Sequence, residues 1–352
     1  MSVHSDLHTR TLSVETRAAG DDCLAVRAEL RDVRHVDLPV YLGVAHPAGV
    51  VHHMTLDLEV DRELTIRAVD ARMGSIPFEP SAKTRGEGCR NVLPSYQRLV
   101  GTPLDADYPL RVLETVGGRL GCFHILALAQ CLPLAVRAAS ARLCAAAVRL
   151  PRGARAGVED SCAPWRADSP RWAEAREGAG GGFGDFRRRL CVRAFADARR
   201  ALGMTAELAD ETAGGVHRGA SLTLGLALPE FTILCAEGRL LGEPFSECGV
   251  TLAGVAALEG LSIVKGFTAA ALARVGGSAG CAHLSALVIA LAPVVPQAAG
   301  ALAGLLRLAP EQMRRERAGN PQLDSCHMWR ADGPLVDLED PRRASPRAGE
   351  TV

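Results

Sequence analysis

Thiols and imidazoles recur at matching places in the two halves of this 352-residue chain. The string Gly121-Cys122-Phe123-His124 reappears as Gly280-Cys281-Ala282-His283. Each half also carries a histidine where a strand hairpin is expected to begin and a cysteine before the helix that follows. The eight candidate metal ligands are His52, Cys89, Cys122, His124, His217, Cys248, Cys281 and His283. Two thiols and two imidazoles per half are a donor set that suits a zinc or iron ion.

The spacing of the Cys-x-His pairs leaves the roles of their residues open. Helical residues two positions apart point roughly 200° apart around the axis. Cys122 and His124 therefore reach one ion only if the cysteine precedes the first regular turn, and the same holds for Cys281 and His283. Histidines that point away from a metal would be natural general bases beside an open site.

A longer string, Asp-Ser-Cys-x-x-Trp-Arg-Ala-Asp, follows in both halves at residues 160–168 and 324–332. Its tryptophans, Trp165 and Trp329, are expected to anchor the return of the chain onto a sheet. Cys162 and Cys326 are candidates for a further ligand or a nucleophile. Two such patterns in the same order, twice, indicate an internal duplication into two domain-sized repeats.

The duplication sets the predicted domain boundaries. A first repeat is expected at residues 1–173, a glycine-rich linker at 174–186, a second repeat at 187–337 and a disordered tail at 338–352.

Periodicity predicts the same order of elements in each repeat. In the first repeat, residues 24–30 alternate between apolar and polar as in a half-buried strand, and residues 54–69 predict a hairpin. Helical spacing follows Cys89, and two further helical stretches meet at Gly117-Gly118. The predicted fold class is α+β, with two tandem copies of a small antiparallel sheet whose helices pack on one face. The two repeats are expected to pack on each other as a pseudo-dimer.

Composition excludes several classes of partner. Forty basic and forty acidic residues give a formal net charge of zero, which argues against a nucleic-acid or acidic membrane surface. The uncharged run 284–306 is long enough to cross a bilayer, but Pro293, Pro296 and Gln297 favour a buried helix. With no apolar leader at the N-terminus, a cytoplasmic location and reduced cysteines are expected.

The shared motifs carry a resemblance to a known family. The hairpin histidine, Gly-Cys-x-His and the Asp-Ser-Cys-His-Met-Trp-Arg string together resemble the bacterial family catalogued as domain of unknown function 2889, over nearly all of each repeat. Members usually carry one copy with a Gly-Cys-Thr-His-Leu motif, to which Gly280-Cys281-Ala282-His283-Leu284 comes closest. The family implies no activity.

A weaker likeness is to iron–sulfur scaffold proteins of the IscU/NifU type, which also place a hairpin, a cysteine, a helix and a Cys/His pair in that order. His52 stands where that family has its first cysteine, and Cys89 stands at the second. Cys122 and His124 match its His-Cys pair in reversed order. The likeness implies an IscU-like fold and is compatible with a mononuclear metal site.

The predicted function is that of a duplicated Cys/His metal-binding protein. Four protein ligands would make the metal structural, and three would leave a position open for a metal-dependent enzyme acting on a small molecule, a choice that the sequence leaves open. One alternative is a metal-free thiol enzyme with Cys122 or Cys281 as nucleophile and the neighbouring histidine as base. The other is a non-catalytic scaffold or interaction module in which these residues only pack. The sequence names neither a catalytic residue nor a substrate.

Overall fold

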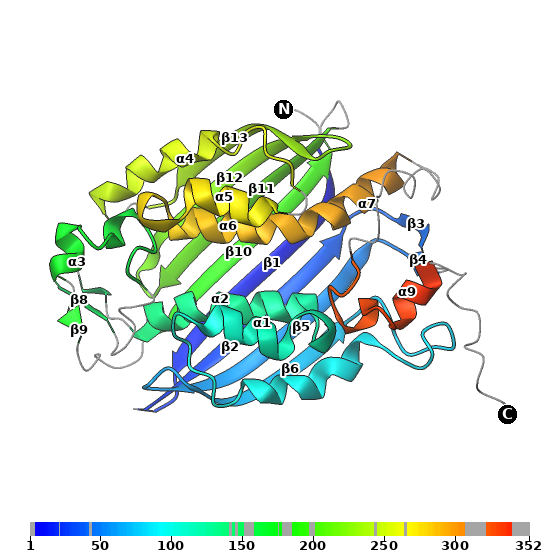
Figure 1. Cartoon of the computed structure of the whole chain (residues 1–352), viewed down its shortest axis with the longest axis horizontal. Coiled ribbons are helices and arrows are strands. Elements are labelled where there is room, and N and C mark those ends of the chain that lie inside the picture. Colours follow the sequence, from blue (N-terminus) through cyan, green and yellow to red (C-terminus); the bar gives the residue numbers. More distant parts are fainter. Residues whose placement is uncertain are drawn as a thin grey trace.

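The computed structural model of the chain places its two repeats in one molecule (Figure 1). The residues described here are 4–20, 22–41, 44–140, 143–144, 147–150, 158–174, 176–177, 185–196, 201–242, 245–263, 266–306 and 322–339. The predicted linker lies mostly outside these ranges, as does the predicted tail from residue 340 onward. Two tail residues belong to a helix, α9 (Pro334–Glu339).

One eight-stranded antiparallel sheet runs through the molecule, in the order β13-β12-β11-β10-β1-β2-β5-β6. The first repeat supplies β1 (Ser5–Ala18), β2 (Cys23–Arg34), β5 (Gly49–Asp61) and β6 (Ile66–Ser75). The second supplies β10 (Phe186–Ala196), β11 (Leu202–Thr212), β12 (Gly215–Ala227) and β13 (Thr232–Leu240). The α+β fold class with antiparallel strands is confirmed.

The two repeats meet in the middle of this sheet, where β1 pairs with β10. Leu12 lies opposite Leu190, which is the equivalent residue of the other repeat. Arg10 pairs with Val192, and Val14 pairs with Arg188, so the register is symmetric about the leucine pair. Such symmetry is what an isologous dimer interface shows, and it gives the duplicated chain the form of a pseudo-dimer.

Strand alternation fills the core as the sequence predicts. Leu24, Val26, Ala28 and Leu30 of β2 are all buried, with partly exposed or exposed residues between them. The same phase continues through the last buried positions of the strand, which are the charged Asp32 and Arg34. A carboxylate in that position must be paired to be tolerated.

Helices cover one face of the sheet (Figure 1). In the first repeat these are α1 (Tyr108–Val116) and α2 (Phe123–Ser140). In the second they are α5 (Phe267–Val275), α6 (Ala282–Leu291) and α7 (Val295–Leu305). The helix predicted after Cys89 is the 3₁₀ segment η1 (Cys89–Leu99). Pro94 interrupts its hydrogen bonding, and Gly101, at φ +85°, follows its end.

Within the described residues, one helical run is long and apolar enough to cross a bilayer, Ala282–Leu305. It comprises α6, the short 3₁₀ segment η7 (Ala292–Val294) and α7, and it lies along the sheet. Its side chains Leu284, Leu287 and Leu291 are buried there, as the predicted core helix requires.

The shorter elements lie at the edges of this body. They are β3 (Leu38–Tyr41), β4 (Val44–His46), β7 (Leu143–Cys144), β8 (Ala147–Leu150), β9 (Arg176–Glu177), α3 (Pro170–Glu174), α4 (Ala253–Ala256), η2 (Gly118–Leu120), η5 (Ser246–Leu252) and η6 (Gly277–Ala279).

The two closing segments, residues 160–168 and 324–332, cross between the repeats. The backbone N–H of Ala163 donates to the carbonyl of Gly280 at 2.9 Å, and that of His327 donates to Gly121 at 2.9 Å. Trp165 packs edge-on against Phe245, with ring centroids 5.8 Å apart. Each closing segment therefore packs on the opposite repeat, an exchange that the sequence did not predict.

Candidate functional site

A buried carboxylate organises the polar residues of the first repeat. Asp32 is fully buried at the end of β2. Arg10, on the adjacent strand β1, grips it with two parallel hydrogen bonds of 2.7 Å from Nε and Nη2. His8 Nε2 lies 3.2 Å from the same carboxylate. The Asp32 carboxylate is thus fixed by two side chains of the neighbouring strand, Arg10 and His8.

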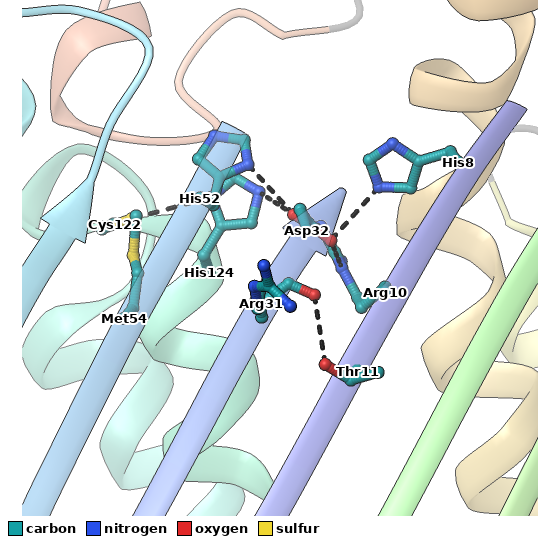
Figure 2. A network of polar contacts seen from close by, with 9 residues as sticks. All are labelled: His8, Arg10, Thr11, Arg31, Asp32, His52, Met54, Cys122 and His124. Carbon is teal, nitrogen blue, oxygen red and sulfur yellow. Dashed lines mark hydrogen bonds and ion pairs between the residues drawn. The ribbon is translucent and has the colours of Figure 1, made fainter. Parts of the chain in front are cut away.

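Two more histidines meet this carboxylate from other elements (Figure 2). His52 on β5 places Nδ1 3.0 Å from Asp32 Oδ2. His124, in the first turn of α2, places Nε2 3.5 Å from the same oxygen. The two imidazole rings stack with centroids 3.8 Å apart. Asp32, His52 and His124 have the mutual spacing that one metal ion needs, and with His8 and Arg10 they form the first cluster.

Electrostatics keeps the carboxylate ionised and the histidines neutral. Burial by itself would raise the pKa of Asp32, but the charge and hydrogen bonds of Arg10 and the hydrogen bonds of His52 and His8 hold that pKa well below its usual range. Burial lowers the pKa values of His8 and His52. Burial, then the neighbouring His52 and Arg10, holds the pKa of His124 well below 6.5. Ionised carboxylate and neutral imidazole are the forms that bind a metal.

The second repeat builds a related cluster around Asp210 on β11. Arg188 on β10 grips this carboxylate with bonds of 2.7 and 2.8 Å. His283, in the first turn of α6, lies 3.1 Å from its Oδ2. Arg218 on β12 lies 3.2 Å from the same oxygen. Arg188, Asp210, Arg218 and His283 form the second cluster, in which a second guanidinium replaces the second imidazole.

The sheet register corrects the predicted equivalence of His52 and His217. Asp32 lies opposite His52 in β2 and β5, whereas Asp210 lies opposite Arg218 in β11 and β12. The same irregularity follows each pair and skips Val51 in β5 and His217 in β12, so His217 is the equivalent of Val51 and Arg218 is the equivalent of His52. His217 is exposed and bonds to Thr212, so it does not meet the other candidates of its repeat.

The protonation balance also differs between the clusters. Burial acts to lower the pKa of His283, but hydrogen bonds to Asp210 and Cys281 raise it above 6.5. Burial acts to raise the pKa of Cys281, but the hydrogen bond and charge of His283 lower it below the usual thiol value. In the first repeat, burial and the nearby Cys326 raise the pKa of Cys122 to about 12. The second cluster alone favours a thiolate beside an imidazolium.

The cysteines predicted as ligands lie beside the two clusters. A cysteine of the exchanged segment lies near them in each repeat. Cys122 Sγ is 3.8 Å from His124 Nδ1, and Cys281 Sγ is 3.9 Å from His283 Nδ1. Cys89 interacts electrostatically with Cys122 and Cys326. In the second repeat, Cys162, Cys248 and Cys281 line one small cavity. Among the described residues, however, the spacing for one ion is met by Asp32, His52 and His124, without a thiol.

The residues that sequence reasoning missed are the buried pairs Arg10–Asp32 and Arg188–Asp210. The sequence carries a signal for both pairs, because Arg10 and Asp32 match Arg188 and Asp210 at the same offset between the two repeats. Asp32 also falls in the apolar phase of its strand, where an unexplained charge points to a paired, functional group. The same offset matches His8 of the first cluster to Phe186, so the second repeat has no equivalent of this histidine.

Comparison with known proteins gives a family and no activity. No curated protein and no solved structure matches the chain, so the likeness to IscU/NifU-type scaffolds is unconfirmed. The model of the family described as protein of unknown function (DUF2889) matches residues 8–137 and 186–297, one segment in each repeat. The chain belongs to this family and carries two tandem copies of its domain.

Proposed function

We propose that the first repeat binds one zinc or iron ion through Asp32, His52 and His124, and that the chain binds one ion and not two. The observation that carries this proposal is the convergence of one carboxylate oxygen and two imidazole nitrogens from β2, β5 and α2. The predicted cysteine ligands then stand beside the site and do not bind the ion.

The separations suit a small ion. Ligands about 2.0–2.2 Å from a tetrahedral zinc lie roughly 3.3–3.6 Å from one another. In the structure, Asp32 Oδ2 lies 3.0 Å from His52 Nδ1 and 3.5 Å from His124 Nε2. Arg10 and His8 contact the carboxylate as supporting partners, the arrangement that fixes a metal ligand in orientation.

The second cluster explains why one ion is expected. Arg218 occupies the position of His52 and lies 3.2 Å from Asp210 Oδ2. A guanidinium has no lone pair to offer a metal and stays charged at any ordinary pH. With Arg188 also paired to Asp210, two fixed positive charges would repel an incoming cation.

The first cluster also offers polar groups to a ligand beside the ion. Three protein ligands leave a coordination position open, at which a metal polarises bound water or substrate. His124 is the most accessible of the three, with 14% of its side chain exposed against 6% for His52. Buried His8 Nδ1 and Arg10 Nη1 have no hydrogen-bond partner among the described residues. These features support a small polar molecule as substrate.

The test is metal content per chain, measured by elemental analysis on untagged protein. One ion is expected in the unaltered protein and none in His52→Arg, which copies the second cluster. His53→Ala is the matched control, because His53 points to the other face of the sheet and pairs with exposed Glu29. Two ions per chain, or an ion retained in His52→Arg, would contradict the proposal.

A further inference from the structure

A small cavity lies beside the second cluster, where the exchanged segment of the first repeat meets the second. Its volume is about 50 Å³. The residues that matter here are Cys162 and Trp165 from the first repeat and Arg218, Phe245, Cys281 and His283 from the second. Cys248 lines the same cavity, so three thiols face it, one from the first repeat and two from the second, and its walls are aromatic and basic.

The exchange brings the backbones of Cys162 and Cys281 together. Ala163 N–H donates to Gly280 C=O at 2.9 Å, and each cysteine is bonded directly to one of these residues. Standard backbone dimensions then place the two Cα atoms within about 8 Å of each other, next to the range of roughly 4.4–6.8 Å seen in disulfides. Both cysteines are free thiols that line the same cavity, so a bond between them on oxidation needs at most a small movement of the backbone.

Cys281 also stands in a relay with a histidine and a carboxylate. Its Sγ lies 3.9 Å from His283 Nδ1, and His283 Nε2 lies 3.1 Å from Asp210 Oδ2. A thiol, an imidazole and a buried carboxylate in this order are the parts of an activated nucleophile. Arg188 and Arg218 add two positive charges beside the single charge of Asp210, which favours a negative sulfur nearby.

We propose that the second repeat carries a dithiol site that reduces small disulfides, with Cys281 as the attacking thiol and Cys162 of the first repeat as the resolving thiol. His283 accepts the proton of Cys281 and is oriented by Asp210. The site requires both repeats, because neither supplies both sulfurs.

The steps balance as a two-electron exchange. The Cys281 thiolate attacks one sulfur of a substrate R–S–S–R, forming a mixed disulfide and releasing R–S⁻, which takes the proton held by His283. The Cys162 thiol then attacks the Cys281 sulfur, and its proton leaves with the second R–S⁻. The substrate is reduced to two thiols, and the protein dithiol is oxidised to a Cys162–Cys281 disulfide.

The first repeat supplies a matched control within the same chain. His327 N–H donates to Gly121 C=O at 2.9 Å, so Cys326 and Cys122 flank an equivalent crossing. Cys122 Sγ, however, packs 3.9 Å from Met54 Sδ. The His124 ring is stacked on the His52 ring, and its Nε2 lies 3.5 Å from Asp32 Oδ2. The backbone arrangement and the Cys–His–Asp order are shared, since Cys122 Sγ lies 3.8 Å from His124 Nδ1. What the first repeat lacks is the second guanidinium, because His52 takes the place of Arg218.

The experiment treats reduced full-length protein with 4,4′-dithiodipyridine under anaerobic, chelated conditions and follows release of thiopyridone. The exposed Cys235 is first changed to serine to remove a competing thiol. A fast phase releasing two equivalents is expected, ending in a Cys162–Cys281 disulfide identified by peptide mass mapping. Cys281→Ser should abolish the fast phase. Cys162→Ser should halve its yield and leave a mixed disulfide on Cys281.

Further variants separate this site from general thiol reactivity and from the metal site. His283→Gln should slow the fast phase about a hundredfold, as loss of a general base does. Cys122→Ser, Cys326→Ser and His52→Arg should leave it unchanged. A fast phase that survives in Cys281→Ser, or two equivalents from Cys162→Ser, would overturn the proposal. Because His52→Arg removes only the proposed metal site, failure of either proposal is recognised separately.

Discussion

The two polar clusters are diverged copies of one arrangement, and their differences are confined to few positions. Both hold a buried aspartate with a bidentate arginine and face it with a histidine from the first turn of a helix. The first cluster adds His52 and His8, where the second has Arg218 and Phe186. One arginine in place of one histidine replaces a neutral, metal-binding group with a permanent cation. Duplication thus kept the scaffold and changed the charge of the group that faces the carboxylate.

The largest expected effect comes from removing the carboxylates. Asp32→Asn and Asp210→Asn should each lower the free energy of unfolding by about 3–5 kcal/mol, because a buried arginine loses its charge partner. Asp210→Asn should cost more, since both Arg188 and Arg218 pair with it. Urea unfolding of metal-free protein measures both values. Equal losses would show that Arg218 does not depend on Asp210 for its charge balance.

The pH dependence of stability should have opposite signs in the two clusters. His8, His52 and His124 have folded-state pKa values below 6.5. Their contribution is therefore present above pH 6.5 and is lost as the pH falls through the folded values. The pKa of His283 is raised, so its contribution is present below pH 6.5 and is lost as the pH rises through the folded value.

This opposition is measurable with two variants. Between pH 7.5 and 5.5, His124→Gln should weaken the loss of stability on acidification, and His283→Gln should steepen it. Each change is at most about 1.4 kcal/mol per pH unit, the limit for one proton. Thermal or urea unfolding of metal-free protein at several pH values gives both slopes. Slopes that change in the same direction would mean that the two histidines titrate alike.

A converse substitution sharpens the metal comparison. Arg218→His places an imidazole opposite Asp210, as in the first cluster, so a second ion per chain is expected. This ion should bind more weakly, because Phe186 cannot contact the carboxylate as His8 does in the first cluster. Competition with a chromogenic chelator measures the affinity. Binding as tight as in the first repeat would show that His8 contributes nothing to the site.

The sequence predicted the order of the strands and helices and some of the residues of the first cluster. Alternation in residues 24–30 identified a strand, and Gly121-Cys122-x-His124 marked the start of a helix that indeed delivers His124 to the first cluster. It missed Asp32 because a single charge at the end of an apolar alternation has no local explanation. His217 was misassigned because the deletion between the matched blocks lets Val216-His217 be matched to Val51-His52, and only the strand register shows that Arg218 corresponds to His52.

The exchange of the closing segments lay beyond sequence reasoning for a different reason. The strings at 160–168 and 324–332 are alike, and local pattern specifies their turns but not the surface on which they pack. Which repeat receives each segment depends on the symmetric pairing of β1 with β10 and on the path that the chain takes around it. Trp165 was predicted to anchor the segment on a sheet, but it packs on Trp172 and on Phe245 of the other repeat.

The smallest predicted effect concerns how firmly each closing segment is held. Arg330 of the second repeat bonds Glu87 of the first through both guanidinium nitrogens at 2.7 and 2.8 Å, with both side chains about three-quarters buried. The equivalent Arg166 pairs with Asp168 of its own segment, in solvent. Arg330→Ala should therefore cost about 1 kcal/mol of stability, and Arg166→Ala close to none. Urea unfolding of the two variants tests this, with protease sensitivity near residue 330 as a local readout. Comparable losses would mean that the ion pair does not hold the segment, and that packing of Trp329 and Trp165 alone keeps the exchanged segments in place.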